Sequence, residues 1–320
     1  MSASVLGLHH VTAIAGDPGE NLAFYTGILG LRLVKRSVNQ DAPDTYHLFY
    51  ADAEGQPGTD LTFFPWPAMG PARKGAAHAV EVGFSVPPGS LGYWADRLRD
   101  AGVAVGDPGE RFGEPTLELE DPHGLGLFLA ETGRPLAAVP WVKSPVPLQH
   151  QLRGFHGVRL LERSLEPTLG FLRDAMGCTD EGEEGGWHRL GAAGGGPGRW
   201  LEVRVAADGR LGAWGTGGIH HVAFRIGGDE ELDRGRLNVA RHGARPTPVI
   251  DRFWFHSVYF REPGGVLFEL ATDGPGFAAD EDPEHLGERL VLPPWLEPRR
   301  AEIEAALPPL GTPEGDGGLS

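Results

Sequence analysis

Cysteine is almost absent from this 320-residue sequence, because Cys178 is the only one. A single cysteine excludes an intramolecular disulfide and a cysteine-rich zinc site, and it suits a reducing compartment. Cys178 has no supporting catalytic motif, so we interpret it as a small buried apolar residue. A Gly-x-Ser-x-Gly elbow is also absent, and the glycine run at 194–196 lacks the strand-to-helix context of a phosphate-binding loop.

Positive charge and long apolar runs are scarce as well. Lys and Arg number 28 against 44 Asp and Glu, the net charge is -16, and no basic patch is present. This excludes nucleic acids and anionic membranes as partners. No apolar run reaches the about 18 residues that a membrane helix needs, and the first residues lack the features of a signal peptide. We expect a soluble, cytoplasmic protein, and the sequence leaves a homo-oligomer open.

The sequence does contain an internal repeat, which is the first signal to look for in a chain of this length. A shift of 147 residues aligns the first quarter with the third, placing Leu8-His9-His10 on Phe155-His156-Gly157, Phe24 on Phe171 and Gly30 on Gly177. A shift of 141 aligns the second quarter with the fourth, placing Gly102 on Gly243, Arg111-Phe112 on Arg252-Phe253 and Asp121-Pro122 on Glu262-Pro263. The chain therefore contains two types of unit, each present twice.

Each quarter has the pattern of a strand, a helix and further strands. The first quarter predicts a strand over 8–14, a helix over 21–28 and strands over 46–50 and 60–64. The fourth predicts a strand over 222–226, a helix over 230–241 and strands over 257–261 and 266–271. A βαβββ unit leaves one sheet face bare and must cover it with another unit. We predict an α+β fold of four βαβββ modules in two pseudo-symmetric pairs, each a curved, barrel-like sheet around a pocket.

Prolines mark the boundary between the halves. The segment 131–153 is rich in proline, which predicts a stiff, extended connection. We predict an N-terminal domain of two modules at 1–135, a linker at 136–153, a C-terminal domain of two modules at 154–275 and an extension at 276–320. The extension is expected to contain a helix over 298–307 and to end in about ten disordered residues.

His10, His221 and Glu269 are candidate ligands of a metal ion. Two imidazoles and one carboxylate on one side of an ion leave the other side open for substrate and O2, as in non-haem Fe(II) oxygenases. Glu269 lies within the apolar run 264–270, where an unpaired carboxylate is costly to bury. A bound cation would compensate for this cost.

The repeat provides a control for this assignment. His10 corresponds to Gly157, Glu269 corresponds to Phe128, and His221 corresponds to Val80 or Glu81. One set of quarters has therefore kept three ligand-type residues, and the other has lost at least two. Because Gly157 cannot act as a ligand, the set is complete only if the first quarter pairs with the fourth.

The choice within each His-His doublet follows from strand geometry. Adjacent residues of a strand face opposite sides of the sheet, so both members of a doublet cannot point straight at one ion. His9 recurs as His156 in a quarter without a site, whereas His10 does not recur. We therefore choose the second member of each doublet.

Two further residues are candidates near this centre. Tyr259, whose repeat mate is Glu118, is either a hydrogen-bond donor to an oxygen on the metal or an ordinary sheet aromatic. Arg252 recurs as Arg111, which favours a structural role and leaves a substrate role open. We interpret the histidines without a repeat-supported partner as surface or structural residues, namely His47, His78, His123, His150, His188, His242, His256 and His285.

Several stretches together carry a family resemblance. They are Leu8-His9-His10-Val11-Thr12, Leu33-Val34-Lys35-Arg36, the run 46–52, Gly154-Phe155-His156, Ile219-His220-His221, the run 263–269 and Asp280-Glu281-Asp282. Over residues 5–295 the sequence resembles the vicinal oxygen chelate superfamily, and more closely its hydroquinone-type ring-cleaving dioxygenases.

The resemblance implies a ring-cleaving (extradiol-type) dioxygenase that acts with O2 on an aromatic diol. It implies Fe(II) held by His10, His221 and Glu269, although Mn(II) or another divalent ion suits the same ligand types. It also implies that His9, His220, Arg252 and Tyr259 are catalytic residues at matching pocket positions.

Two other functions stay open from the sequence. The same scaffold supports metal-dependent glyoxalase-type isomerases and thiol transferases, which need no O2. A non-enzymatic protein that sequesters a small molecule is the other class, and it would need no bound metal. The three-ligand set argues against the second class, and only the resemblance separates a dioxygenase from an isomerase.

Overall fold

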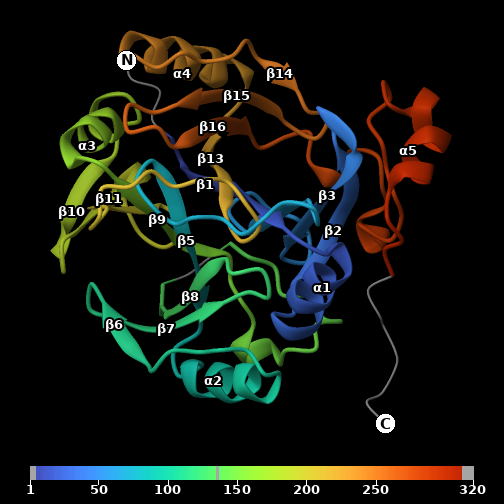
Figure 1. The fold of residues 1–320 in the computed structure, drawn as a ribbon, viewed down its shortest axis with the longest axis horizontal. Helices are drawn as coiled ribbons and strands as arrows, with labels where there is room; N and C mark the ends of the chain where they lie inside the picture. Colours follow the sequence, from blue (N-terminus) through green and yellow to red (C-terminus); the bar gives the residue numbers. More distant parts are fainter. Residues whose placement is uncertain (1–4, 135–136, 312–320) are drawn as a thin grey trace.

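The computed structural model describes residues 5–134 and 137–311, which form two curved eight-stranded sheets (Figure 1). Every quarter of the chain contains a strand, a helix and three further strands, as predicted. The first module has β1 (Gly7–Ala15), β2 (Arg32–Asn39), β3 (Ala42–Ala51) and β4 (Asp60–Pro65). The second has β5 (His78–Val86), β6 (Gly109–Arg111), β7 (Glu114–Glu120) and β8 (Gly126–Glu131).

The second half of the chain repeats this order. The third module has β9 (Phe155–Glu162), β10 (Thr179–Glu184), β11 (Trp187–Gly191) and β12 (Trp200–Val205). The fourth has β13 (Ile219–Ile226), β14 (Ile250–Asp251), β15 (His256–Arg261) and β16 (Leu267–Thr272).

Each sheet combines one module from each half of the chain. The first sheet has the strand order β14-β15-β16-β13-β1-β4-β3-β2, so it joins the fourth module to the first. The second sheet has the order β10-β11-β12-β9-β5-β8-β7-β6 and joins the third module to the second. The antiparallel pairs β1–β13 and β5–β9 are the junctions. The predicted pairing of the first quarter with the fourth is therefore confirmed, and the domain boundaries at 135, 153 and 275 stay a prediction.

The helices follow the first strand of each module. They are α1 (Pro18–Leu22), which continues as a π-helical segment over Ala23–Ile28, α2 (Leu91–Asp100), α3 (Leu165–Asp174) and α4 (Asp229–Arg241). Asp17 caps α1 because its carboxylate accepts the backbone N–H groups of Gly19 and Glu20 at 2.8 and 2.9 Å. Short 3-10 turns lie at Leu148–His150, Ala192–Gly194, Phe277–Ala279, Pro283–His285 and Glu297–Arg299. Within the described residues, no helix is both long and apolar enough to cross a membrane.

Apolar side chains from both sheets share one core. The nine residues of β1 are all buried, because this strand lies in the middle of the first sheet between β13 and β4. The shared core includes Val11, Leu61 and Phe224 of the first sheet and Val82, Val158 and Leu201 of the second. Burial on both faces accounts for the nearly continuous apolar character of such strands.

The C-terminal extension packs along the edge of the first sheet beside β2 and β3 (Figure 1). Its helix α5 (Arg300–Ala306) lies within the predicted range 298–307. The buried Lys35 of β2 donates to the carbonyl of Phe277 at 2.9 Å and to Asp280 at 2.8 Å, and it also bonds Glu281 at 2.5 Å. The predicted disorder at the chain end concerns residues that lie almost entirely outside the described ranges.

Candidate metal centre

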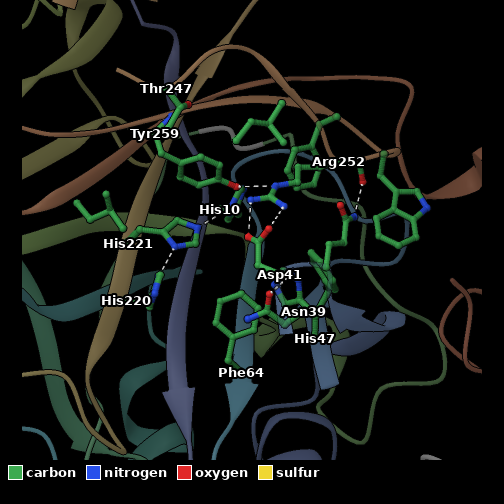
Figure 2. Close-up of a pocket in the computed structure, with 16 residues that line it drawn as sticks. His10, Asn39, Asp41, His47, Phe64, His220, His221, Thr247, Arg252 and Tyr259 are labelled. Carbon is green, nitrogen blue, oxygen red and sulfur yellow. Dashed lines mark hydrogen bonds and ion pairs between the residues drawn. The ribbon is translucent and has the colours of Figure 1, made fainter. Parts of the chain in front are cut away.

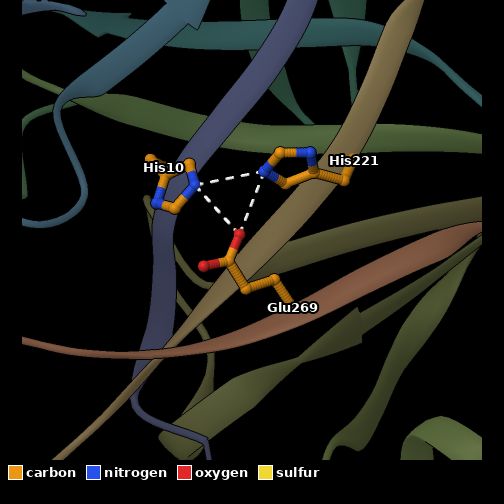
Figure 3. Close-up of side chains that lie close together, drawn as sticks. All are labelled: His10, His221 and Glu269. Atoms are coloured by element: carbon orange, nitrogen blue, oxygen red, sulfur yellow. Dashed lines mark hydrogen bonds and ion pairs between the residues drawn. The ribbon is translucent and has the colours of Figure 1, made fainter. Parts of the chain in front are cut away.

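Three predicted ligands meet at the junction of the first and fourth modules (Figure 3). His10 lies on β1, His221 on β13 and Glu269 on β16, and these strands are adjacent in the first sheet. Oε2 of Glu269 lies 3.1 Å from Nε2 of His10 and 3.0 Å from Nε2 of His221. The two Nε2 atoms are 3.3 Å apart, and all three side chains are buried.

This triangle fits a divalent cation. Ligand atoms at about 2.0–2.2 Å from an ion and at right angles to one another are about 3.0 Å apart, which matches the observed edges. Oε2 of Glu269 is buried and, among residues 5–134 and 137–311, has no aligned hydrogen-bond donor, so it has an unused lone pair beside the two rings. Three electron-rich atoms that converge in a buried site favour a shared cation. That these residues bind a metal stays a prediction.

The other oxygen of Glu269 is held by Ser257. The hydroxyl of Ser257 donates to Oε1, and both side chains are completely buried. This contact fixes the rotation of the carboxylate and directs Oε2 at the histidines. Sequence reasoning missed Ser257, although the strand period places it on the same face of β15 as Tyr259.

Each candidate ligand histidine has the preceding histidine as its neighbour. Nδ1 of His9 lies 2.9 Å from Nδ1 of His10, and Nδ1 of His220 lies 2.8 Å from Nδ1 of His221. Only the second member of each doublet belongs to the triangle, as predicted from strand alternation. The first members, however, do not simply face the opposite side of the sheet, because both doublets lie at β-bulges.

Burial keeps the first histidines neutral. Burial, followed by the neighbouring His10, lowers the pKa of His9 to about 3. Burial and His221 likewise lower the pKa of His220 to about 3. Burial alone would raise the pKa of Glu269, but His10 and His221 lower it well below its usual value. The carboxylate is therefore ionised at neutral pH.

A pocket of about 370 Å³ opens beside the triangle (Figure 2). Its apolar walls come from Phe49, Phe64, Trp254 and Phe255, and His10, His220 and His221 also line it. Aromatic side chains in the lining suit a flat ring, which can stack on them or meet their edges. The pocket can therefore hold a small aromatic molecule within reach of the candidate metal position.

Arg252 and Tyr259 lie together on the pocket wall (Figure 2). Nε of Arg252 donates to the hydroxyl of Tyr259 at 3.3 Å, and the guanidinium pairs with Asp41 at 2.9 Å. Burial raises the pKa of Tyr259 further above its usual value, so the hydroxyl keeps its proton. Because its oxygen accepts from Arg252, its hydrogen is free to point elsewhere.

His9 and His47 occupy places that the sequence did not indicate. His9 is buried behind His10, packs against Phe255 and is not among the pocket-lining residues. His47 does line the pocket, where the centroid of its ring lies 3.9 Å from that of Phe49. Its Nε2 lies 2.9 Å from the hydroxyl oxygen of Thr62. The strand period, which puts residues 47 and 49 on one face of β3, was the available signal.

The second sheet has a charge network where the first has the triangle. At the β1–β13 junction His221 pairs with Thr12, and at the β5–β9 junction Glu81 pairs with Arg159. Because Arg159 is the repeat mate of Thr12, Glu81 rather than Val80 corresponds to His221. Arg159 pairs with Glu202 at 2.6 Å and with Glu81 at 3.6 Å. Further pairs link Arg111 to Glu81 and Glu118, and Arg189 to Glu202 and Glu114.

Comparisons with known proteins agree with this architecture. The family model "Glyoxalase/Bleomycin resistance protein/Dioxygenase superfamily" matches residues 7–127. The chain is 42% identical over 319 residues to MhqO of Bacillus subtilis, which is named as a candidate ring-cleaving dioxygenase. The alignment covers 99% of this chain and 100% of that protein. It is 35% identical to a chlorohydroquinone/hydroquinone 1,2-dioxygenase of Sphingobium indicum over 93% of this chain and 95% of that one.

Solved structures show the same fold. A crystal structure of a candidate dioxygenase from Bacillus subtilis superposes with a TM-score of 0.92 at 40% identity, covering 96% of this chain and 98% of that one. Glyoxalase I of Zea mays superposes with a TM-score of 0.62 at 15% identity over 83% of this chain and 92% of that one, a likeness of fold alone. The chain therefore belongs to the glyoxalase/bleomycin resistance protein/dioxygenase superfamily, and its full-length relatives there are named as ring-cleaving or hydroquinone dioxygenases.

Proposed function

We propose that this chain is a non-haem, Fe(II)-dependent ring-cleaving dioxygenase that acts with O2 on an aromatic diol, a substituted hydroquinone. The observation that carries the proposal is the buried triangle of His10, His221 and Glu269 beside an aromatic-walled pocket. The names of the full-length relatives support the same reaction.

His10, His221 and Glu269 would hold the iron on one side. When bound, Fe(II) would bring a diol oxygen and O2 together on its open side and stabilise the developing negative charge. The protein contributes a fixed ligand triangle, in which Ser257 prevents rotation of the carboxylate. A triangle that is fixed before the reaction would bind the ion without reorganisation during the reaction.

The pocket walls orient the substrate ring. Phe64 and Phe255 offer aromatic surfaces near His220 and His10, respectively, so a ring that packs on either one lies near the histidines of the pocket. A ring packed on these apolar surfaces would displace water from them, which would strengthen the polar contacts to the diol. A diol hydroxyl directed at the triangle places the ring carbon that bears it close to the reacting centre.

Tyr259 and Arg252 provide the polar side of the pocket. The hydroxyl of Tyr259 accepts from Arg252 and keeps its own proton, so it can donate a hydrogen bond to an oxygen of the bound reactants. Arg252 is held by Asp41 at the pocket mouth, and this pairing positions the guanidinium. Donors that are fixed before the reaction stabilise negative charge more than mobile water does.

The decisive experiment is anaerobic reconstitution of the full chain with Fe(II), followed by measurement of O2 uptake with substituted hydroquinones and catechols. We expect uptake of one O2 per ring and incorporation of both atoms of isotopically labelled O2 into a ring-opened product. The absence of uptake with any diol, together with anaerobic turnover of a thiol conjugate with Mn(II), Ni(II) or Zn(II), would instead identify an isomerase or thiol transferase.

A further inference from the structure

The His-His doublets lie at irregularities of the β1–β13 ladder. Leu8 pairs with Phe224 and Val11 with Val222, so β1 contains an extra residue at the His9-His10 doublet. The pairing then moves from Thr12–His221 to Ala13–Ile219, so β13 contains an extra residue at His220. A bulge of this kind turns a side chain away from the regular alternation. It accounts for the contact between the rings of adjacent residues.

The same bulges occur in the second sheet, which lacks the ligand set. There the pairing moves from Gly83–Gly157 to Phe84–Phe155, which leaves His156 as the extra residue at the position that corresponds to His9. His156 is also buried, but its neighbour is Gly157, and its ring bonds Ser85 and Glu114, each at 3.2 Å. The bulge therefore belongs to the fold, whereas the ring-to-ring contact belongs to the sheet with the candidate metal centre.

A short chain of hydrogen bonds determines which nitrogen of His10 carries a hydrogen. Nε2 of His9 lies 3.0 Å from the backbone carbonyl of Thr272, which can only accept, so Nε2 of His9 carries the hydrogen. In a neutral ring Nδ1 of His9 is then an acceptor, and Nδ1 of His10 must be the donor. Nε2 of His10 is left with its lone pair, and this is the atom that faces Glu269 and His221.

We infer that His9 is a positioning residue that sets the metal-binding tautomer and the ring orientation of His10. The inference rests on the proposed metal site and changes the role expected for His9, which is not among the pocket-lining residues. Ligand histidines commonly donate their second nitrogen to a carboxylate or carbonyl that fixes them. In this chain a second imidazole, itself anchored on Thr272, performs that function.

The second doublet differs in its anchoring. His220 contacts His221 in the same way but lines the pocket, where its ring stacks on Trp214 with centroids 4.4 Å apart. In the described part of the chain, no carbonyl anchors His220 as Thr272 anchors His9. His9 is therefore the more rigid support of the two.

Substitutions at His9 can separate this role from simple packing. The oxygen of asparagine matches Nδ1 of histidine in position, so His9→Asn keeps an acceptor for His10 and loses the contact to Thr272. The amide nitrogen of glutamine matches Nε2, so His9→Gln keeps the contact to Thr272 and loses the acceptor. His9→Phe keeps the ring and loses both contacts. His156→Phe is the matched control at the equivalent bulge.

Binding of Fe(II) and of Co(II) to the metal-free full chain is measured under anaerobic conditions by calorimetry. We expect His9→Phe and His9→Gln to weaken binding by about 10- to 100-fold, and His9→Asn to stay within about threefold of the wild type because the acceptor is retained. His156→Phe should leave binding unchanged. Nitrogen-15 spectra of the metal-free proteins should show the hydrogen of His10 on Nδ1 in the wild type and in His9→Asn, and a mixture of tautomers in the other two.

The outcomes distinguish the inference from the proposed function. The positioning role would be overturned if the wild type and His9→Phe bound the ions with equal affinity. It would also be overturned if His9→Gln kept its affinity while His9→Asn lost it. Either result would leave the proposed function standing. A wild-type chain that bound neither ion would overturn the proposed function, and the inference with it.

Discussion

Ser257 donates a hydrogen bond to one oxygen of Glu269, and this contact leaves the other oxygen facing His10 and His221. We predict that Glu269→Gln keeps a partner for Ser257 but removes the only negative charge of the triangle. Binding of Fe(II) should be lost. The metal-free variant should be less stable than the metal-free wild type, because His10 and His221 stabilise the ionised carboxylate in the folded state and lower its pKa.

This prediction is checked by thermal unfolding with and without Fe(II). A ligand at 100 times its Kd stabilises the folded state by about 2.7 kcal/mol, so the wild type should shift upward on metal addition and Glu269→Gln should not. Glu81→Gln, at the position equivalent to His221 in the second sheet, is the control and should retain the shift. An equal shift in Glu269→Gln would contradict the ligand assignment.

Tyr259→Phe tests the polar side of the pocket. The hydroxyl lies 3.3 Å from Nε of Arg252, and the loss of one fixed donor commonly lowers kcat by about 10²-fold. We expect kcat to fall by about that factor while the affinity for Fe(II) is unchanged. Steady-state O2 uptake and calorimetry measure the two quantities. Tyr46→Phe, whose hydroxyl contacts the carbonyl of Pro308, is the matched control.

Glu162 makes stability depend on pH. Burial, followed by the charge of Glu262, raises the pKa of Glu162 from 4.5 to about 8. The folded state therefore holds this proton more tightly than the unfolded state does. The resulting stabilisation is complete below pH 4.5 and is lost as the pH rises to about 8. The free energy of unfolding should fall by up to about 1.4 kcal/mol per pH unit in that window.

Glu162→Gln should remove most of this slope, because the amide does not titrate. Urea unfolding at several pH values in the window measures it. Glu166→Gln, on the exposed surface of α3, should keep the wild-type slope. If Glu162→Gln and the wild type have the same slope, the assignment to Glu162 is wrong.

Lys35→Met should detach the C-terminal extension from the first sheet. The fully buried ammonium group contacts Phe277, Asp280 and Glu281, and its removal takes the positive charge away from both carboxylates, of which Asp280 keeps the indole N–H of Trp254. The loss of one member of a buried pair costs about 3–5 kcal/mol. Lys74→Met, which breaks the exposed pair with Glu120, should cost about 0–1 kcal/mol. Urea unfolding of both variants measures the difference.

The internal repeat made much of the fold predictable. Because Gly157 and Phe128 replace two ligands, the repeat predicted that the first and fourth modules share a sheet, and the strand order confirms this. It also identified the three residues that the structure brings together as a candidate metal centre.

Local irregularities and long-range contacts were not predictable in the same way. A β-bulge leaves no clear pattern of polarity, so the contact between His9 and His10 could not be inferred from strand alternation. The positions of Ser257 and His47 depend on which strands are adjacent across the sheet. A lysine is normally expected at the surface. Lys35 is buried because the C-terminal extension covers it.

The pairing of distant modules in one sheet has a consequence for biosynthesis. The first candidate ligand is residue 10 and the last is residue 269, so a ribosome must complete most of the chain before the set exists. The first module also lacks its sheet partner until the fourth has emerged. A metal ion could therefore meet the complete set only on a nearly finished polypeptide, and a product truncated before Glu269 would lack one of the three candidate ligands.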